Sequence, residues 1–158
     1  MTNPIRRAEP RDIPDLTRLL VQVNMVHHNG RPDLFKGPAT KYTEAELREI
    51  LRDDQRPIFV WTDEAGNVRG YAFSVFEQIV GSNLRTDVKT LYIDDLCVDE
   101  QARGQGIGKD LYEFVVKFAR ESGCYNLTLN VWAANPGAMR FYEKCGLIPQ
   151  KIGMEKIL

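Results

Sequence analysis

The sequence predicts an α/β protein with a mixed sheet. Apolar residues recur at helical spacing in some segments and alternate or form short runs in others, and the two kinds of segment follow one another along the chain. The stretch from Lys89 to Trp132 reads strand, helix, strand, which predicts a right-handed crossover between parallel strands. We expect one domain over residues 1–158, because domains typically hold roughly 100–200 residues.

Spacing and turn residues define the first elements. A short strand at Pro4 to Ala8 precedes an amphipathic helix from Arg11 to Val26, and a break follows at Asn29-Gly30-Arg31-Pro32. Thr43, with Glu46 three residues later, forms a capping box for a second helix that ends at Arg52. Strands at Pro57 to Thr62 and Arg69 to Val80 flank a turn and predict a hairpin.

The second half carries the strongest helix signals. After the strand Lys89 to Val98, a helix is expected from Gly106 to Ser122, with Gly123 ending it. A strand from Asn126 to Trp132 leads to Asn135-Pro136, where Asn suits the N-cap and Pro the first turn of a helix to Lys144. Two short strands, Pro149–Ile152 and Met154–Leu158, are expected to close the chain.

Composition excludes several classes of function. The chain has 21 Lys and Arg against 22 Asp and Glu, which argues against a nucleic-acid binder. It contains no apolar run of 18 residues, so no membrane span is predicted, and its polar start lacks the apolar core of a secretory signal. The three cysteines, Cys97, Cys124 and Cys145, match neither a disulfide framework nor a zinc site. We expect reduced thiols and a cytoplasmic protein without a metal.

The glycine-rich segment Gln101-Ala102-Arg103-Gly104-Gln105-Gly106-Ile107-Gly108-Lys109 is the most informative part of the chain. It follows a strand and opens a helix, so its backbone N–H groups and the positive end of the helix dipole suit a phosphate or pyrophosphate. The spacing fits neither a Walker A loop, since Asp110 follows Lys109, nor a Rossmann loop, whose third glycine would fall one residue later than Gly108. A simple helix-capping turn is the competing interpretation.

With these motifs, the chain resembles the GNAT superfamily of acetyl-CoA-dependent N-acetyltransferases. The resemblance rests on Gln101, Gly104 and Gly106 in a [QR]-x-x-G-x-[GA] pattern and on Asn135 followed by Phe141-Tyr142-Glu143-Lys144-Cys145-Gly146-Leu147, in which Leu147 replaces the usual Phe. It covers nearly the whole chain. It implies a mostly antiparallel central sheet with a splayed parallel strand pair, flanked by about four helices.

The resemblance also implies a cofactor site. The pyrophosphate of CoA would lie on the backbone of the glycine loop and its pantetheine arm along the preceding strand. The residues concerned are Leu96, Cys97, Val98, Arg103, Gly104, Gln105, Gly106, Ile107, Gly108, Lys109 and Asn135. Asn135 is also a helix cap, and both roles are compatible because a cap uses only the side-chain oxygen. Tyr142 would protonate the departing thiolate; a packing tyrosine is the alternative.

The adjacent acids Asp94 and Asp95 are candidates for the base. Strand alternation predicts that Asp94 points with Tyr92 and Leu96, and Asp95 with Leu91, Ile93 and Cys97. The segment is similar to that of the diamine (spermidine/spermine) acetyltransferases, whose matching acid implies Asp94 as base, although Asp is one methylene shorter than Glu. Asp95 is the alternative, or a structural acid. Asp87 and Asp99 are expected on a solvated surface.

Other candidates are weaker. His27 and His28 could relay a proton or bind substrate, but helix-end histidines without a role are favoured. Cys97 could be a nucleophile, but a small buried residue is favoured. Tyr92 and Trp132 could line the cleft. Another family branch, which acts on protein N-terminal amines, often carries Glu where this chain has Asn130, which cannot act as a base.

The sequence therefore predicts an enzyme that acetylates a primary amine on a small molecule by direct attack in a ternary complex. Acetylation of a protein lysine or N-terminal amine is the first alternative. A non-catalytic acyl-CoA-binding domain is the second. No nucleic-acid or membrane partner is expected, and a homodimer is compatible with the resemblance.

Overall fold

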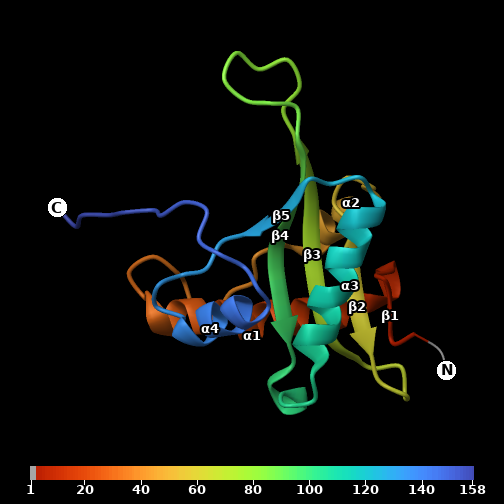
Figure 1. The fold of residues 1–158 in the computed structure, drawn as a ribbon. Helices are drawn as coiled ribbons and strands as arrows, with labels where there is room; N and C mark the ends of the chain where they lie inside the picture. Colours follow the sequence, from red (N-terminus) through yellow and green to blue (C-terminus); the bar gives the residue numbers. More distant parts are fainter. Residues whose placement is uncertain (1–2) are drawn as a thin grey trace.

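A computed structural model describes residues 3–158, and its helices lie on both faces of one central sheet (Figure 1). The strands are β1 (Ile5–Arg7), β2 (Ile58–Thr62), β3 (Val68–Gln78), β4 (Lys89–Val98) and β5 (Asn126–Leu129). The α-helices are α1 (Ile13–Gly30), α2 (Glu44–Leu51), α3 (Ile107–Glu121) and α4 (Pro136–Lys144). Two short 3-10 helices, η1 (Pro10–Asp12) and η2 (Glu100–Ala102), join them.

The sheet is mixed, as the sequence predicts. Its strand order is β1-β2-β3-β4-β5, and the first four strands are antiparallel. The last pair, β4 and β5, is parallel, with Thr90 to Ile93 opposite Asn126 to Leu129. The crossover between these two strands is α3, so the predicted strand–helix–strand unit is confirmed.

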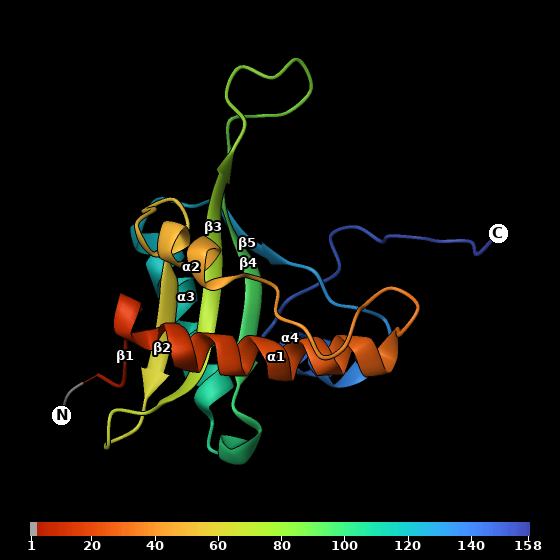
Figure 2. The same cartoon turned by 180° about the vertical axis from the view of Figure 1, so that it is seen from behind.

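Two hydrophobic cores form because each sheet face buries the apolar stripe of its own helices. On one face, Leu16 and Leu20 of α1 pack with Leu47 of α2. On the other face, Ile107 and Leu111 of α3 pack against the sheet. Figure 2 shows α1 and α2 in front of the sheet, and Figure 1 shows α3 in front from the opposite side.

Local capping explains where the helices begin. The Thr43 hydroxyl accepts a hydrogen bond from the Glu46 N–H at 3.2 Å, and Glu46 accepts from the Thr43 N–H, which completes the predicted capping box. The end predicted for the first helix is wrong. α1 continues through Asn29 and Gly30, because the Arg31 N–H still bonds the His27 carbonyl.

The two terminal strands are also a wrong prediction. Residues 148–158 form no strand and leave the body of the molecule as an exposed extended arm (Figure 1). A strand needs a neighbouring strand for its backbone hydrogen bonds, and no strand among residues 3–158 pairs with this segment. The strand predicted to Trp132 ends at Leu129. Among residues 3–158, no helix is long and apolar enough to cross a bilayer.

Candidate active site

A β-bulge at Asp94 divides β4 into two halves that face opposite ways. Phe73 of β3 pairs with Asp95, and the next residue, Ser74, pairs with Ile93, so Asp94 is the extra residue. Ile93 therefore packs in the α3-side core, whereas Cys97 packs in the core beneath α1. The predicted grouping of Asp95 with Ile93, and of Asp94 with Leu96, is wrong because strand alternation breaks at a bulge.

Both acids consequently lie toward the α1–α2 side of the sheet. The Tyr42 hydroxyl donates to Asp94 at 2.5 Å, and the Lys41 ammonium donates to the same carboxylate at 2.9 Å. The Tyr71 hydroxyl donates to Asp95 at 2.8 Å. Burial raises the pKa of Asp95 to about 6, against the hydrogen bond from Tyr71, which lowers it. Two neighbouring carboxylates thus have different hydrogen-bond partners.

Beyond the bulge, β4 diverges from β5. The last parallel pair joins Ile93 to Leu129, and β4 continues to Val98. Leu96 and Val98 pack against the α3-side core, and Cys97 is buried on the opposite face. Burial raises the pKa of the Cys97 thiol to about 12, so the thiolate that a nucleophile requires is disfavoured. This favours the packing role for Cys97.

The glycine loop follows β4 and opens α3. Gly104 and Gly106 have φ of +81° and +79°, a left-handed conformation that glycine adopts without strain. A Cβ at either position would meet no atom within 4 Å, so the backbone conformation and not crowding requires glycine. Residues Arg103 to Gly106 are exposed, and Gly106 is the N-cap of α3. The N–H groups of the first α3 turn are therefore available to an anion.

Asp99 anchors this loop, a role that the sequence analysis missed. The side chain is 0% exposed, not solvated as predicted, and it accepts from Arg18 at 2.8 Å, from Arg69 at 3.4 Å and from the Gln101 N–H at 3.1 Å. Burial alone would raise its pKa, but Arg18 and the Gln101 N–H hold the pKa at about 2. The arginines lie 81 and 30 residues away in the chain, so no local pattern could have revealed the cluster.

Helix α4 brings the second motif to the same place. The Asn135 side-chain oxygen accepts from the Ala138 N–H at 3.1 Å, which confirms the predicted cap and does not use the amide nitrogen. A Cβ on Gly108 would lie 3.4 Å from Val98 and 3.5 Å from the Phe141 ring, so α3, β4 and α4 meet closely there. Burial, followed by the charge of Asp95, raises the pKa of Tyr142 and keeps its phenol protonated.

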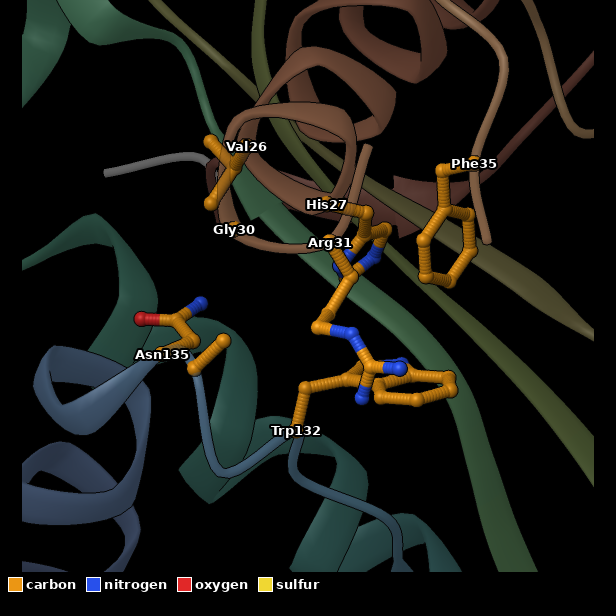
Figure 3. A pocket seen from close by; sticks show the side chains of 8 residues that line it. Val26, His27, Gly30, Arg31, Phe35, Trp132 and Asn135 are labelled. Atoms are coloured by element: carbon orange, nitrogen blue, oxygen red, sulfur yellow. The ribbon is translucent and has the colours of Figure 1, made fainter. Parts of the chain in front are cut away.

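A shallow pocket lies where the end of α1 meets the β5–α4 connection (Figure 3). The His27 ring stacks on Phe35 with centroids 5.0 Å apart, and Phe35 meets Trp132 edge-on at 5.1 Å. Asn135 also lines the pocket. Burial and then Lys41 lower the pKa of His27. His28 instead bonds the Phe35 carbonyl through Nδ1 at 2.7 Å, a role in holding the loop.

The remaining candidates are Asn130 and Tyr92, near the end of β5, and Lys109, in the first turn of α3. The Asn130 amide donates to the Tyr92 hydroxyl at 3.1 Å, so these two side chains meet across the parallel pair. Lys109 is exposed and lies 3.7 Å from Glu113 of the same helix. The site therefore joins four parts of the chain: the bulged end of β4, the glycine loop, the start of α4 and the pocket at the end of α1. A helix start that suits an anion, an open strand edge, two acids and a protonated phenol would together suit acyl transfer from a phosphate-bearing carrier to a nucleophile.

Comparisons with known proteins agree with this arrangement. The chain is 37% identical over 73 residues to glucosamine 6-phosphate N-acetyltransferase from Arabidopsis thaliana, which is 46% of this chain and 47% of that protein. It is 36% identical over 136 residues to thialysine N-epsilon-acetyltransferase from Bos taurus, which is 86% of this chain and 72% of that protein. The match spans less than half the length of the plant glucosamine 6-phosphate enzymes.

Solved structures share the fold over nearly the full chain. A mutant of the BH1408 protein from Bacillus halodurans superposes with a TM-score of 0.93 at 29% identity and covers 98% of both chains. The Arabidopsis thaliana glucosamine-6-phosphate N-acetyltransferase superposes with a TM-score of 0.71 at 28% identity and covers 99% of both chains. Residues 24–147 match the acetyltransferase (GNAT) family model. This chain is therefore a member of the GNAT acetyltransferase family.

Proposed function

We propose that this protein transfers an acetyl group from acetyl-CoA to a primary amine of a small molecule, by direct attack within a ternary complex. The observation that carries the proposal is the bulge at Asp94. It turns two carboxylates to one side of β4 where β4 diverges from β5. An amine nucleophile arrives mostly as ammonium at neutral pH and must lose a proton, so a nearby acid meets a chemical need.

The residues of this chain fit acetyl-CoA. The N–H groups of the exposed loop Arg103 to Gly106 and of the first α3 turn, through Gly108, suit its pyrophosphate, because left-handed Gly104 and Gly106 let the backbone turn toward an anion. The backbone of Leu96 to Val98 is open on the β5 side and suits an extended arm. The Asn135 amide nitrogen, at the start of α4, and the Lys109 ammonium, in the first turn of α3, add hydrogen-bond donors for the cofactor. When bound, acetyl-CoA supplies the acetyl group as an activated thioester.

Asp94 accepts the amine proton in this proposal, directly or through a water molecule. Tyr42 and Lys41 hold the Asp94 carboxylate in place and leave it a lone pair to use. Backbone N–H groups of Asp95 to Val98 polarise the carbonyl that the amine attacks, and Tyr142 gives its proton to the departing thiolate. An Asp94→Asn variant should lower kcat by roughly 10²–10⁴-fold, with a smaller loss in Asp95→Asn. Equal losses would contradict this assignment.

Thermal unfolding tests the cofactor first. A ligand at about 100 times its Kd adds roughly 2.7 kcal/mol of stability, which is a shift of several degrees in Tm for a domain of this size. Acetyl-CoA and free CoA should both raise Tm, and ATP at the same concentration should not. No shift with acetyl-CoA would overturn the assignment of the glycine loop.

An amine panel with thiol release as readout tests the acceptor. It should hold spermidine, thialysine, glucosamine 6-phosphate, a lysine peptide and a peptide with a free N-terminus. Faster turnover of the free small amines supports the proposal, and faster turnover of a peptide supports the protein acetyltransferase instead. Asn130 argues against a protein N-terminal amine as the acceptor, because an amide cannot serve as the base that a Glu at this position would provide. Cofactor binding without turnover on any amine would identify a non-catalytic acyl-CoA-binding domain.

A further inference from the structure

Lys41, in the loop between α1 and α2, places its amine on the acid that we assign as the base. The Lys41 Nζ lies 2.9 Å from a carboxylate oxygen of Asp94 and 3.4 Å from the Asp94 carbonyl oxygen. The Asp94 side chain is only 17% exposed, whereas the Lys41 side chain is 44% exposed. The contact therefore joins an accessible amine to a mostly buried acid, unlike a pair of solvated surface charges.

The backbone on the α2 side of Lys41 is fixed. The Tyr42 ring stacks on Phe73 of β3, with ring centroids 5.6 Å apart and an interplanar angle of 15°. The next residue, Thr43, forms the capping box that begins α2. Lys41 is thus presented from a held segment, and only its unbranched side chain has to move for the amine to shift along β4.

The amine also lies beside the segment that we assign to the thioester arm. Asp94 is the extra residue of the bulge, directly after the last residue of β4 that pairs with β5. Leu96, where the open backbone begins, is two residues further along the same strand. The charge of Lys41 also reaches His27 of the α1 pocket, where it adds to burial in lowering the pKa of that histidine. Lys41 therefore holds its amine where the proposed function requires the nitrogen of an acceptor.

We propose that Lys41 is an internal acetyl acceptor, modified by the active site of its own chain; this inference rests on the proposed function. The Lys41 ammonium loses a proton to Asp94, its nitrogen forms a bond to the thioester carbonyl carbon, and the carbon–sulfur bond breaks. The nitrogen loses a second proton, and Tyr142 protonates the thiolate and is reprotonated from solvent. The products are acetylated Lys41, the CoA thiol and one proton.

The position of the amine favours this reaction, because a nucleophile already held at the site needs no second molecule to be brought there. The modification would also change the site. Acetylation replaces the ammonium with a neutral amide and removes the ion pair between Lys41 and Asp94.

Mass spectrometry of the full chain, incubated with acetyl-CoA and no added amine, tests the inference. One acetyl group should add about 42 Da, and peptide mapping should locate it on Lys41. Lys36 is the internal control, because it is an exposed lysine in the same loop and uncatalysed acetylation would modify both residues alike. Free CoA should add no mass. An unmodified Lys41, or equal acetylation of Lys36, would overturn the inference.

Two variants and a dilution series test the route. Lys41→Arg should remove the added mass while keeping a positive charge beside Asp94. Asp94→Asn should slow acetylation of Lys41 by roughly 10²-fold or more, whereas the surface variant Asp54→Asn should not slow it. The wild-type rate should be independent of protein concentration. A rate that rises with protein concentration, or an unchanged rate in Asp94→Asn, would contradict acetylation within one chain.

The rise in Tm with acetyl-CoA and the turnover of added amines, measured on the same wild-type protein, separate this inference from the proposed function. A protein that binds acetyl-CoA and acetylates an added amine but leaves Lys41 unmodified would overturn the inference alone. A protein whose Tm does not respond to acetyl-CoA would overturn both.

Discussion

Tyr142 lies in a part of the molecule where burial and a nearby carboxylate together keep its phenol protonated. If it supplies the proton to the departing thiolate, Tyr142→Phe should lower kcat by roughly 10–10⁴-fold. The acetyl-CoA-dependent rise in Tm should stay unchanged. Tyr125→Phe is the control, because Tyr125 is an exposed tyrosine outside the site. An unchanged kcat in Tyr142→Phe would show that the residue only packs.

Asp95 should make stability depend on pH in an unusual direction. Its pKa is about 6 in the folded protein, above the ordinary 3.8, so the folded state binds more protons between these values and stability falls as pH rises through that window. Asp95→Asn removes this effect. The wild type should lose about 1 kcal/mol of stability between pH 5 and pH 8 through this group, and the variant should not. The stability of Asp95→Asn relative to the wild type should therefore be greater at pH 8 than at pH 5 by that amount.

Denaturant unfolding at the two pH values measures this difference. Asp54→Asn is the control, because the Asp54 side chain is exposed and its ion pair with Arg7 lies at the surface. A pH-independent difference for Asp95→Asn would mean that the carboxyl of Asp95 titrates at its ordinary value. The kcat profile of the same variant then tells whether the group also takes part in proton transfer.

At the scale of elements, a glycine variant in the loop can be compared with one elsewhere, so that the effect of backbone strain is distinguished from the effect on cofactor binding. Gly106→Ala should cost about 1–2 kcal/mol of stability, because alanine is strained at positive φ. It should also weaken acetyl-CoA binding, since the N–H groups at the start of α3 would move. Gly66 gives a matched control: its φ is +86° and a Cβ there would also meet no atom.

Gly66→Ala should cost similar stability and leave acetyl-CoA affinity unchanged, as measured by titration calorimetry. An equal loss of affinity in both variants would mean that the effect of Gly106→Ala is only general destabilisation. Unchanged affinity in both would remove the loop from the binding site.

The elements also show what local sequence can and cannot predict. Helices α2 and α4 begin where capping residues predict, because Thr43 and Asn135 act on N–H groups three residues away. The bulge at Asp94 depends on the register with β3, and the burial of Asp99 depends on two distant arginines, so neither was predicted. The prediction of two terminal strands was wrong, because an alternating pattern shows that a segment is able to pair but does not show that a partner strand lies beside it. The proposed roles of Asp94, Tyr142 and the loop remain predictions.

At the scale of the whole molecule, one sheet separates two hydrophobic cores, one on each of its faces. Leu47→Ala, beneath α2, and Leu111→Ala, beneath α3, should each cost 2–5 kcal/mol, since both side chains are fully buried. The double variant should lose the sum within about 0.5 kcal/mol, because the residues lie on opposite faces. Urea unfolding of the four proteins measures this. Strong non-additivity would show that the faces communicate through the sheet.

The bulge in β4 has a consequence for where adjacent side chains can lie. Because one extra residue reverses the phase of the strand, Ile93 packs on the α3 side of the sheet, whereas Asp95 and Cys97 face the α1–α2 side. Tyr42 is constrained by its packing on Phe73 as well as by its hydrogen bond to Asp94. A single extra residue thus places two adjacent acids on the same side of a strand, which regular alternation would not allow.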